Sequence, residues 1–496
     1  MWTKSIDPAA VKEVSAKIAA HYRCVPIGWE GKALKVAMAG TPDLEILDEM
    51  RVVLQKEIRV LVAPEAEIQK AMKDHYGIGA DTLERLADED VHAKTPELQG
   101  TDLDAAQEAS VSKFVNQMFL EAYQNRATDI HLQPDAEDLR VRYRIDGVLY
   151  EARIAESLKR FQAAITSRIK IMADLSISEK RLPQDGRIMI RVAGHEMDLR
   201  VSTLPTPFGE SLGIRFLTSR KFLDLTHLGF ADEDLKELQS YLTKPHGIVF
   251  LTGPTGSGKT TTLYAFLKQL DSTALNIITM EDPIEYQMKG ITQVQVHPKI
   301  GLTFAQGLRA MLRHDPDVMM VGEVRDLETA EIAIRVALTG HLVFSTLHTN
   351  DAPGAVTRLQ DIGVEPYLIS SSVLCMIAQR LVRLICKECR RPAPLKKELC
   401  VEFGIRPDGP EVTVYEGAGC ERCKYTGYHG RTVIYEILPV RFSIQELIAA
   451  RAPANLIREK AMAEGMRTLR QCGWQKVLDG LTTPEEVIRV TLQETL

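Results

Sequence analysis

The chain has 496 residues, of which 45% are hydrophobic and 26% are charged, and its formal net charge is -6. A chain of this length divides into several domains, each with its own core, and its ordinary composition argues against a disordered or fibrous protein. The negative net charge gives a long polyanion no electrostatic reason to bind the whole surface, so we do not expect nucleic acid as the main partner.

The start of the chain, Met1–Ala10, lacks the basic residues and apolar stretch of a signal peptide, and no apolar run of about eighteen residues occurs anywhere. We therefore expect a cytoplasmic protein. The chain has eight cysteines. Because the cytosol keeps thiols reduced, metal binding or simple burial is a better explanation for them than disulfides.

The first predicted domain is a small α/β domain over residues 1–82. Its pattern is helix, two short strands around the turn Gly28–Gly31, helix, strand and helix, with Pro42 and Pro64 in first turns. Acidic residues then accumulate and the apolar periodicity lapses. This change predicts an exposed, extended linker over residues 83–109.

The second predicted domain is an α+β domain over residues 110–220. Alternating apolar residues indicate strands, and Asp146-Gly147 and Ala193-Gly194 are typical of tight hairpin turns. The expected elements are helices over 111–125 and 158–172 and strands over 129–133, 139–145, 148–153 and 211–217.

The third predicted domain covers residues 221–496 and alternates helices with short β-branched strands. This alternation predicts a parallel, doubly wound sheet. A cysteine-flanked insertion follows Arg391, and two helices come after it. The expected strands are 248–251, 276–280, 318–321 and 342–346, and the two late helices are 444–450 and 453–464.

A glycine-rich segment directly follows the strand 248–251 and precedes a helix-forming run, which matches a Walker A phosphate loop in sequence and in context. Backbone N–H groups and the helix N-terminus surround the phosphates of ATP, Lys259 reaches the β and γ oxygens, and Thr260 binds Mg²⁺. The alternative is a glycine-rich turn without a ligand. The predicted nucleotide-binding residues are Gly253, Pro254, Thr255, Gly256, Ser257, Gly258, Lys259, Thr260 and Thr261.

The strand 318–321 ends in Gly322-Glu323, the arrangement of a Walker B strand, whose final carboxylate faces the nucleotide crevice. The alternative is a core strand followed by a solvated acid. The usual metal-binding aspartate is missing, so another acid must complete the Mg²⁺ shell. Glu281 and Asp282, which end the strand 276–280, are the candidates.

Two histidines, His341 and His348, bracket the strand 342–346. A histidine beside an apolar strand is often a hydrogen-bonded core residue, and that alternative applies to both. The strand after Walker B ends where a γ-phosphate sensor belongs, and this position favours His348.

Two Cys-x-x-Cys pairs provide four thiolates, the usual ligand set of a tetrahedral structural zinc site. Thirty residues separate the pairs, more than the usual spacing. A redox pair and plain buried thiols are the alternatives. Because protein ligands fill every coordination position, we expect no catalytic role. The predicted zinc ligands are Cys386, Cys389, Cys420 and Cys423.

Several motifs together resemble the secretion-superfamily ATPases of type II secretion and type IV pilus assembly. They are the phosphate loop, Met280-Glu-Asp-Pro-Ile-Glu-Tyr286, Gly322-Glu-Val-Arg-Asp326 and the segment from His341 to Thr349. The likeness extends from about Val111 to the C-terminus. Lys244-Pro-His-Gly247 and the segment from His297 to Phe304 look closer to the general secretion pathway protein E branch. Further matching segments are 127–132, 180–186, 199–205 and the tetracysteine element ending in Gly430-Arg431-Thr432.

The resemblance implies a RecA-like P-loop core, preceded by a PAS-like α+β domain and a small N-terminal α/β domain. It implies a homo-hexamer that hydrolyses ATP to assemble a pseudopilus. The expected partners are inner-membrane secretion platform proteins and their cytoplasmic domains, contacted peripherally at the inner membrane. The catalytic residues implied are Glu281, Glu323 and His348, and the candidate phosphate-contacting arginines are Arg200, Arg215, Arg309, Arg313 and Arg325.

One departure from the family concerns Gly209-Glu210-Ser211, because relatives usually have arginine at the third position. Three other functions stay open. A type IV pilus assembly ATPase is the nearest, a nucleic-acid motor is disfavoured by the acidic charge balance, and a nucleotide-gated scaffold is disfavoured by the presence of Glu281 and Glu323.

Overall fold

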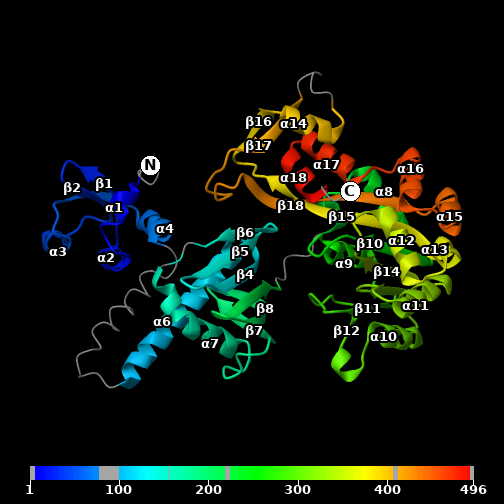
Figure 1. The fold of residues 1–496 in the computed structure, drawn as a ribbon, viewed down its shortest axis with the longest axis horizontal. Coiled ribbons are helices and arrows are strands. Elements are labelled where there is room, and N and C mark those ends of the chain that lie inside the picture. The colour runs from blue at the N-terminus through cyan, green and yellow to red at the C-terminus, as the bar shows by residue number, and fades with distance from the viewer. Residues whose placement is uncertain are drawn as a thin grey trace. The chain divides into compact units, whose positions relative to one another are not determined.

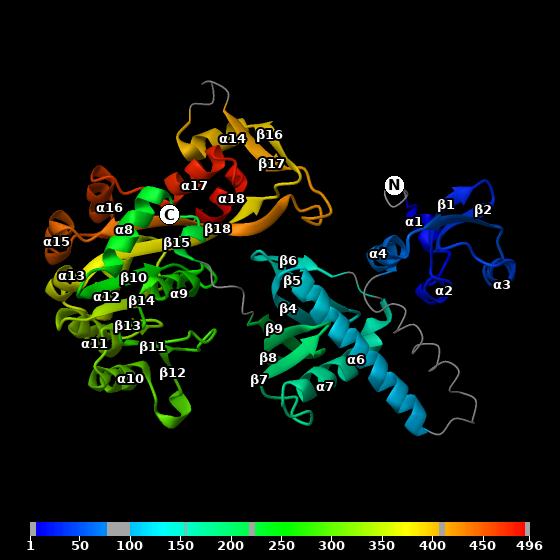
Figure 2. The ribbon, with the colours of Figure 1, turned by 180° about the vertical axis from the view of Figure 1, so that it is seen from behind.

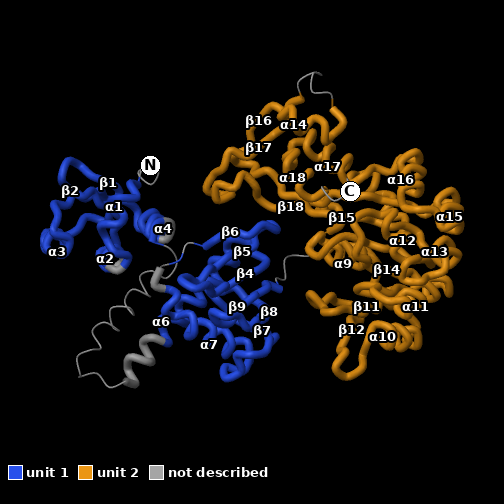
Figure 3. The backbone as a smooth tube through the Cα atoms, viewed as in Figure 1, with its two compact units in different colours: residues 1–218 blue, residues 219–496 orange. Residues whose placement is uncertain are grey.

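The chain divides into two compact units, residues 1–218 and 219–496 (Figure 3). No helix in the described part of the chain is long and apolar enough to cross a membrane. The computed structural model describes residues 6–76, 100–152, 154, 156–217, 224–405 and 412–491.

The first unit begins with a three-stranded sheet in the order β1-β2-β3, where β1 and β2 are antiparallel and β2 and β3 are parallel (Figure 1). Gly31 in the hairpin has a φ of 63°, a conformation that glycine adopts without a Cβ clash. The predicted order of elements is confirmed, except that two short helices replace the first one. The elements are α1 Pro8–Val11, α2 Ala16–His21, β1 Cys24–Glu30, β2 Ala33–Ala39, α3 Leu44–Leu54, β3 Ile58–Ala63 and α4 Glu65–Tyr76.

A six-stranded antiparallel sheet follows in the same unit, in the order β6-β5-β4-β9-β8-β7. Helices α6 and α7 lie against the sheet (Figure 2). Alternate residues of its strands, such as Ile130 and Leu132, pack into a core with these helices. The elements are α6 Gly100–Gln124, β4 Ala127–Pro134, β5 Leu139–Ile145, β6 Val148–Glu151, η2 Glu156–Phe161, α7 Gln162–Met172, β7 Gln184–Val192, β8 His195–Thr206 and β9 Gly209–Phe216.

Helix α6 begins at Gly100, so the extended linker predicted up to residue 109 is wrong for residues 100–109. The second half of that stretch, residues 105–109, consists of three alanines, one glutamine and one glutamate, which favour helix, and apolar periodicity is not needed for it to be helical. The rest of the predicted linker, residues 83–99, lies outside the described residues.

The second unit is built on a seven-stranded sheet in the order β12-β11-β13-β14-β10-β15-β18. Every neighbouring pair is parallel except β15 and β18, which confirms the predicted doubly wound core. All residues of β10 and β14 are buried, as is typical of central parallel strands. Because β10, β14 and β13 are neighbouring parallel strands, their carboxyl ends lie together at one edge of the sheet.

The central part of this unit places helices α9 and α11 against strands β10 and β14. Its elements are η3 Leu225–His227, α8 Asp232–Leu242, β10 Gly247–Thr252, α9 Lys259–Gln269, β11 Ile277–Glu281, β12 Thr292–Gln295, η4 Pro298–Ile300, α10 Phe304–Met311, η5 Leu312–His314, β13 Val318–Val321, α11 Leu327–Leu338, β14 Leu342–Leu347, α12 Ala352–Ile362 and α13 Pro366–Ser372.

The long strands β15 and β18 pair along most of their lengths. The segment between them in the sequence contains a small two-stranded sheet, β16-β17. The cysteine pairs lie where β15 leaves the core and where β18 returns to it. The elements are β15 Val373–Ile385, β16 Arg390–Pro394, α14 Lys397–Cys400, η6 Val401–Phe403, β17 Thr413–Gly417, β18 Tyr428–Pro439, α15 Phe442–Ala449, α16 Ala454–Ala463, α17 Leu469–Leu478 and α18 Pro484–Thr491.

Candidate functional site

The phosphate loop joins the buried strand β10 to helix α9. Gly256 and Gly258 have φ values of 79° and 90°, which only glycine adopts without strain. A Cβ on Gly253 would lie 2.6 Å from the backbone oxygen of Gln379, so a side chain is excluded there as well. The backbone conformation of the loop therefore explains why these positions are glycine. The loop ends at the N-terminus of α9, and helix N-termini bind anions.

Lys259 is the first residue of α9, and its side chain is buried. Its Nζ donates hydrogen bonds to the backbone oxygens of Gly253 at 2.6 Å and Pro254 at 3.2 Å. Burial lowers the pKa of Lys259 to about 8, although the nearby Glu323 carboxylate opposes this and Arg380 adds to it. A buried ammonium group held by carbonyl oxygens in a glycine loop is suited to bind an anion.

Glu323 follows β13 and lies at the same edge of the sheet. Its Oε1 forms an ion pair with Arg325 Nη2 at 2.6 Å, and its Oε2 lies 3.2 Å from His348 Nε2. The Glu323 side chain is 12% exposed. The structure thus brings Glu323 and His348 into contact and places the Glu323 carboxylate close enough to Lys259 to oppose the lowering of its pKa.

Threonine hydroxyls fix the three strand ends relative to one another. The hydroxyls of Thr252 and Thr349 are 2.7 Å apart, which joins the end of β10 to the end of β14. Thr346 Oγ1 donates to the backbone oxygen of Gly322 at 2.7 Å, which joins β14 to the end of β13. These threonines were not among the site residues predicted from the sequence, although Thr349 directly follows the predicted His348.

Glu281 has a different environment from Glu323, because its side chain is buried between β11, β12 and α9. Its Oε1 accepts from Thr279 Oγ1 at 2.6 Å and from Gln293 Nε2 at 3.1 Å, and its Oε2 accepts from the Tyr264 hydroxyl. Burial, helped by Glu281, raises the pKa of Tyr264 and keeps it a donor. Asp282, the other candidate acid, is exposed.

His341 lies at the opposite end of β14 from His348. Its Nδ1 is 3.1 Å from the backbone oxygen of Val336 and 3.2 Å from Thr339 Oγ1. These local contacts agree with the alternative that His341 is a structural residue.

The three candidate arginines of the second unit have partners within that unit. Arg325 contacts Glu323, Arg309 forms an ion pair with Glu328 at 2.6 Å, and Arg313 donates to the backbone oxygen of Arg309 at 3.0 Å. Among these contacts, only that of Arg325 reaches a predicted catalytic residue, Glu323.

The candidate arginines of the first unit lie on the face of the six-stranded sheet opposite its core. Arg215 forms an ion pair with Asp129 at 2.8 Å and is paired across the strands with Arg200. Arg144, opposite Asp129, and Arg187, opposite Arg200, extend the same row. The same face also holds Asp198, whose Oδ1 accepts from Arg187 Nε at 2.7 Å. With four arginines and two aspartates, this row makes the face basic on balance.

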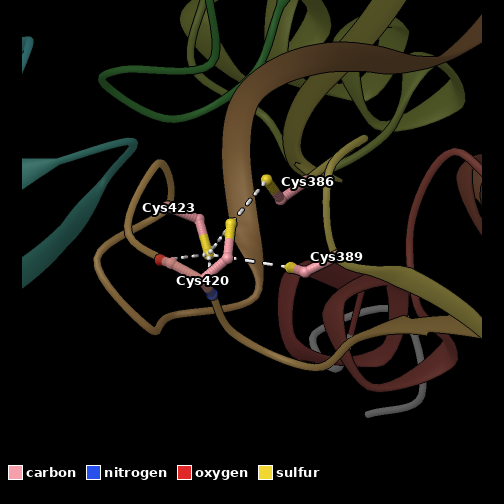
Figure 4. A group of neighbouring side chains, drawn as sticks. All are labelled: Cys386, Cys389, Cys420 and Cys423. Carbon is pink, nitrogen blue, oxygen red and sulfur yellow. Dashed lines mark hydrogen bonds between the residues drawn. The ribbon is translucent and has the colours of Figure 1, made fainter. Parts of the chain in front are cut away.

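The four predicted zinc ligands converge in the second unit, with all their Sγ atoms within 4.8 Å of one another (Figure 4). Measured Sγ–Sγ distances are 3.7 Å for Cys386–Cys420 and 3.8 Å for both Cys389–Cys423 and Cys420–Cys423. A tetrahedral site with Zn–S bonds of about 2.3 Å has edges of about 3.8 Å. The residues present therefore fit a Cys₄ zinc site.

Two family models match the chain. Residues 104–489 match the family described as Type II/IV secretion system protein, and residues 2–82 match the MshEN domain.

Curated relatives match almost the whole length. Type IV pilus assembly ATPase PilB of Myxococcus xanthus (strain DK1622) is 44% identical over 97% of this chain and 87% of its own. Type II secretion system protein E of Aeromonas hydrophila is 41% identical over 98% of both chains. Among solved structures, the Legionella pneumophila ATPase DotB covers 77% of this chain and 95% of its own with a TM-score of 0.55. At 20% identity, that likeness concerns the fold alone.

Proposed function

Because the chain belongs to the type II/IV secretion system protein family, we propose that it is an ATP hydrolase that powers type II protein secretion. One observation carries the proposal. At one edge of the parallel sheet, the buried Lys259 of the phosphate loop lies within electrostatic reach of Glu323, which contacts His348. A phosphate loop, an acid and a histidine at one edge are the groups that phosphoryl transfer to water requires.

Each group has a distinct task in this reaction. Lys259 and the loop backbone hold the β and γ phosphates. Thr260, with Asp282, would hold a Mg²⁺ ion, which would supply positive charge to the phosphates. Glu323 positions and polarises the attacking water, and His348 orients Glu323 and senses the γ-phosphate. Glu281, held by three side chains, shapes the crevice from β11.

Further cations would stabilise the negative charge on the transferring phosphoryl group, and an arginine that contacts this group can raise the rate by roughly 10³- to 10⁵-fold. Arg200 and Arg215 lie on the basic face of the first unit, and their chemistry suits a phosphate. A hexamer supplies such residues when domains of neighbouring subunits close on the nucleotide. We assign Arg309 a supporting role through its ion pair with Glu328 of α11, and Arg313 a supporting role through its hydrogen bond to the backbone oxygen of Arg309.

The Cys₄ cluster holds a structural Zn²⁺. A zinc with four thiolates has no open position, so it stabilises the insertion between β15 and β18 and takes no part in hydrolysis. Burial raises the pKa of the Cys423 thiol, but hydrogen bonds from the backbone N–H groups of Cys420 and Gly427 lower it, and the resulting pKa is about 7. This thiol is therefore readily deprotonated for metal binding.

The proposed organisation has a partner-docking domain over residues 1–82, a linker, a PAS-like domain over 110–220 and the ATPase domain over 221–496. The motor works in the cytoplasm, attached peripherally to inner-membrane platform proteins. The second candidate, type IV pilus assembly, is supported by the Myxococcus relative.

Deleting the gene in its host and complementing it with the wild type or with Lys259→Ala tests the proposal. Failure of Lys259→Ala to restore release of exported proteins, with surface pili intact, supports type II secretion. Loss of pili with normal protein release would assign the chain to pilus assembly instead.

A further inference from the structure

Strand β15 runs beside the phosphate-loop strand β10 and places two polar side chains against the loop. Gln379 is fully buried; its Nε2 donates to the Ser257 backbone oxygen at 2.8 Å, and its Oε1 accepts from Thr262 Oγ1 at 2.9 Å. Arg380, 7% exposed, has Nη1 3.1 Å from the position that a Cβ on Gly253 would take. This strand therefore contacts the loop at its first glycine and at the start of its helix.

The other end of the Arg380 guanidinium contacts the segment that follows β14. Its Nη2 donates to the backbone oxygen of Asn350 at 2.9 Å and to Asn350 Oδ1 at 3.2 Å. Asn350 is two residues beyond His348, and the residue between them, Thr349, is bonded to Thr252. Its Nη1 donates to the backbone oxygen of Gln379 on β15 at 3.2 Å. The Arg380 side chain thus bonds the segment that carries His348 to β15, and Gln379 bonds β15 to the phosphate loop.

We propose that Arg380 is a positioning residue for ATP hydrolysis, which holds the segment after His348 in register with the phosphate loop. The inference rests on the proposed roles of Lys259, Glu323 and His348. The planar guanidinium can bond both sides at once, whereas the single ammonium of a lysine cannot hold the same two directions. Hydrolysis is sensitive to such positioning, because a shift of about 1 Å can cost about 10²-fold in rate.

Two variants separate the forked geometry of Arg380 from its charge. Arg380→Lys keeps the charge and loses the fork, so we expect kcat for ATP to fall about 10- to 100-fold, with the affinity for ADP unchanged. Arg380→Gln loses both, so we expect kcat to fall at least as far, again with the affinity for ADP unchanged. Asn350→Ala removes one acceptor, and we expect a smaller loss of kcat with unchanged ADP affinity.

The experiment measures kcat, KM, ADP affinity and thermal unfolding of the full-length chain. Arg335→Gln, which removes an exposed arginine of α11, is the matched control and should behave as wild type. Wild-type kcat in Arg380→Lys, or a loss of ADP affinity in folded Arg380→Lys as large as its loss of kcat, would overturn the inference. If Arg380→Gln does not fold, the kcat values of Arg380→Lys and Asn350→Ala decide whether the inference holds.

Parallel measurements on Lys259→Ala and Glu323→Gln separate this inference from the proposed function. If both of these variants lose turnover while folded Arg380→Lys and Asn350→Ala keep it, only the role of Arg380 is wrong. If Lys259→Ala and Glu323→Gln keep turnover, the proposed function itself fails.

Discussion

The lowered pKa of Lys259 predicts that nucleotide affinity falls at a pH where an ordinary lysine is still charged. With a pKa of about 8, about half of the free protein carries the ammonium at pH 8 and about one tenth at pH 9, whereas a lysine with a pKa of about 10.4 stays almost wholly protonated. If the charged form binds phosphate, the Kd for ADP rises about fivefold between pH 8 and pH 9.

The sign follows from linkage. Phosphate favours the protonated lysine, so the pKa of Lys259 rises in the complex and binding above pH 8 takes up a proton. The fall therefore occurs in affinity and in kcat/KM, while kcat at saturating ATP does not show it. Isothermal titration of ADP at several pH values, in buffers with different ionisation enthalpies, measures both affinity and proton uptake.

Lys259→Arg is the control for this experiment, because its charge does not titrate in this range and its pH profile should be flat. Constant ADP affinity up to about pH 9.5 in the wild type, without proton uptake, would refute the reasoning.

Three further predictions concern the rest of the chain. Metal analysis of protein purified without chelator should find one Zn²⁺ per chain, and Cys420→Ser should lose it and unfold the insertion while ADP binding persists; a metal content near zero would contradict the site. Glu486 is completely buried and bonded to Arg383 at 2.8 Å, so Glu486→Ala should lower the free energy of unfolding of the second unit by about 3–5 kcal/mol, and an unchanged denaturation midpoint would argue against this. Arg200→Ala and Arg215→Ala should fold and bind ATP but lose most turnover, and turnover per subunit should rise with protein concentration; monomers as active as assembled rings would contradict the arginine proposal.

Residues that act within one short segment were predictable from the sequence. The phosphate loop, the acid after β13 and the histidine after β14 each follow an apolar strand directly. Parallel pairing then brings the carboxyl ends of these strands to one edge. The parallel core was predictable for the same reason, since helix and strand patterns alternate at regular intervals.

Residues that act across long sequence separations were not predictable. Gln379 and Arg380 lie on β15, whose run of apolar residues with interspersed polar ones fits a buried helix as well as a strand. The sequence patterns therefore predicted neither β15 nor β18. The environment of Glu281 depends on Gln293 and Tyr264, which meet it only after β12 and α9 have packed. A motif predicted that this acid matters, but not that its side chain is buried in a hydrogen-bond network.

Turnover and ADP binding of Glu323→Gln, measured beside Lys259→Ala, test most directly whether the edge of the parallel sheet is an ATPase site. Glu323 acts mainly in the transition state and Lys259 also in the ground state. We predict that Glu323→Gln binds ADP as the wild type does and has lost hydrolysis, whereas Lys259→Ala has lost both. Near-wild-type turnover in Glu323→Gln would contradict the mechanism.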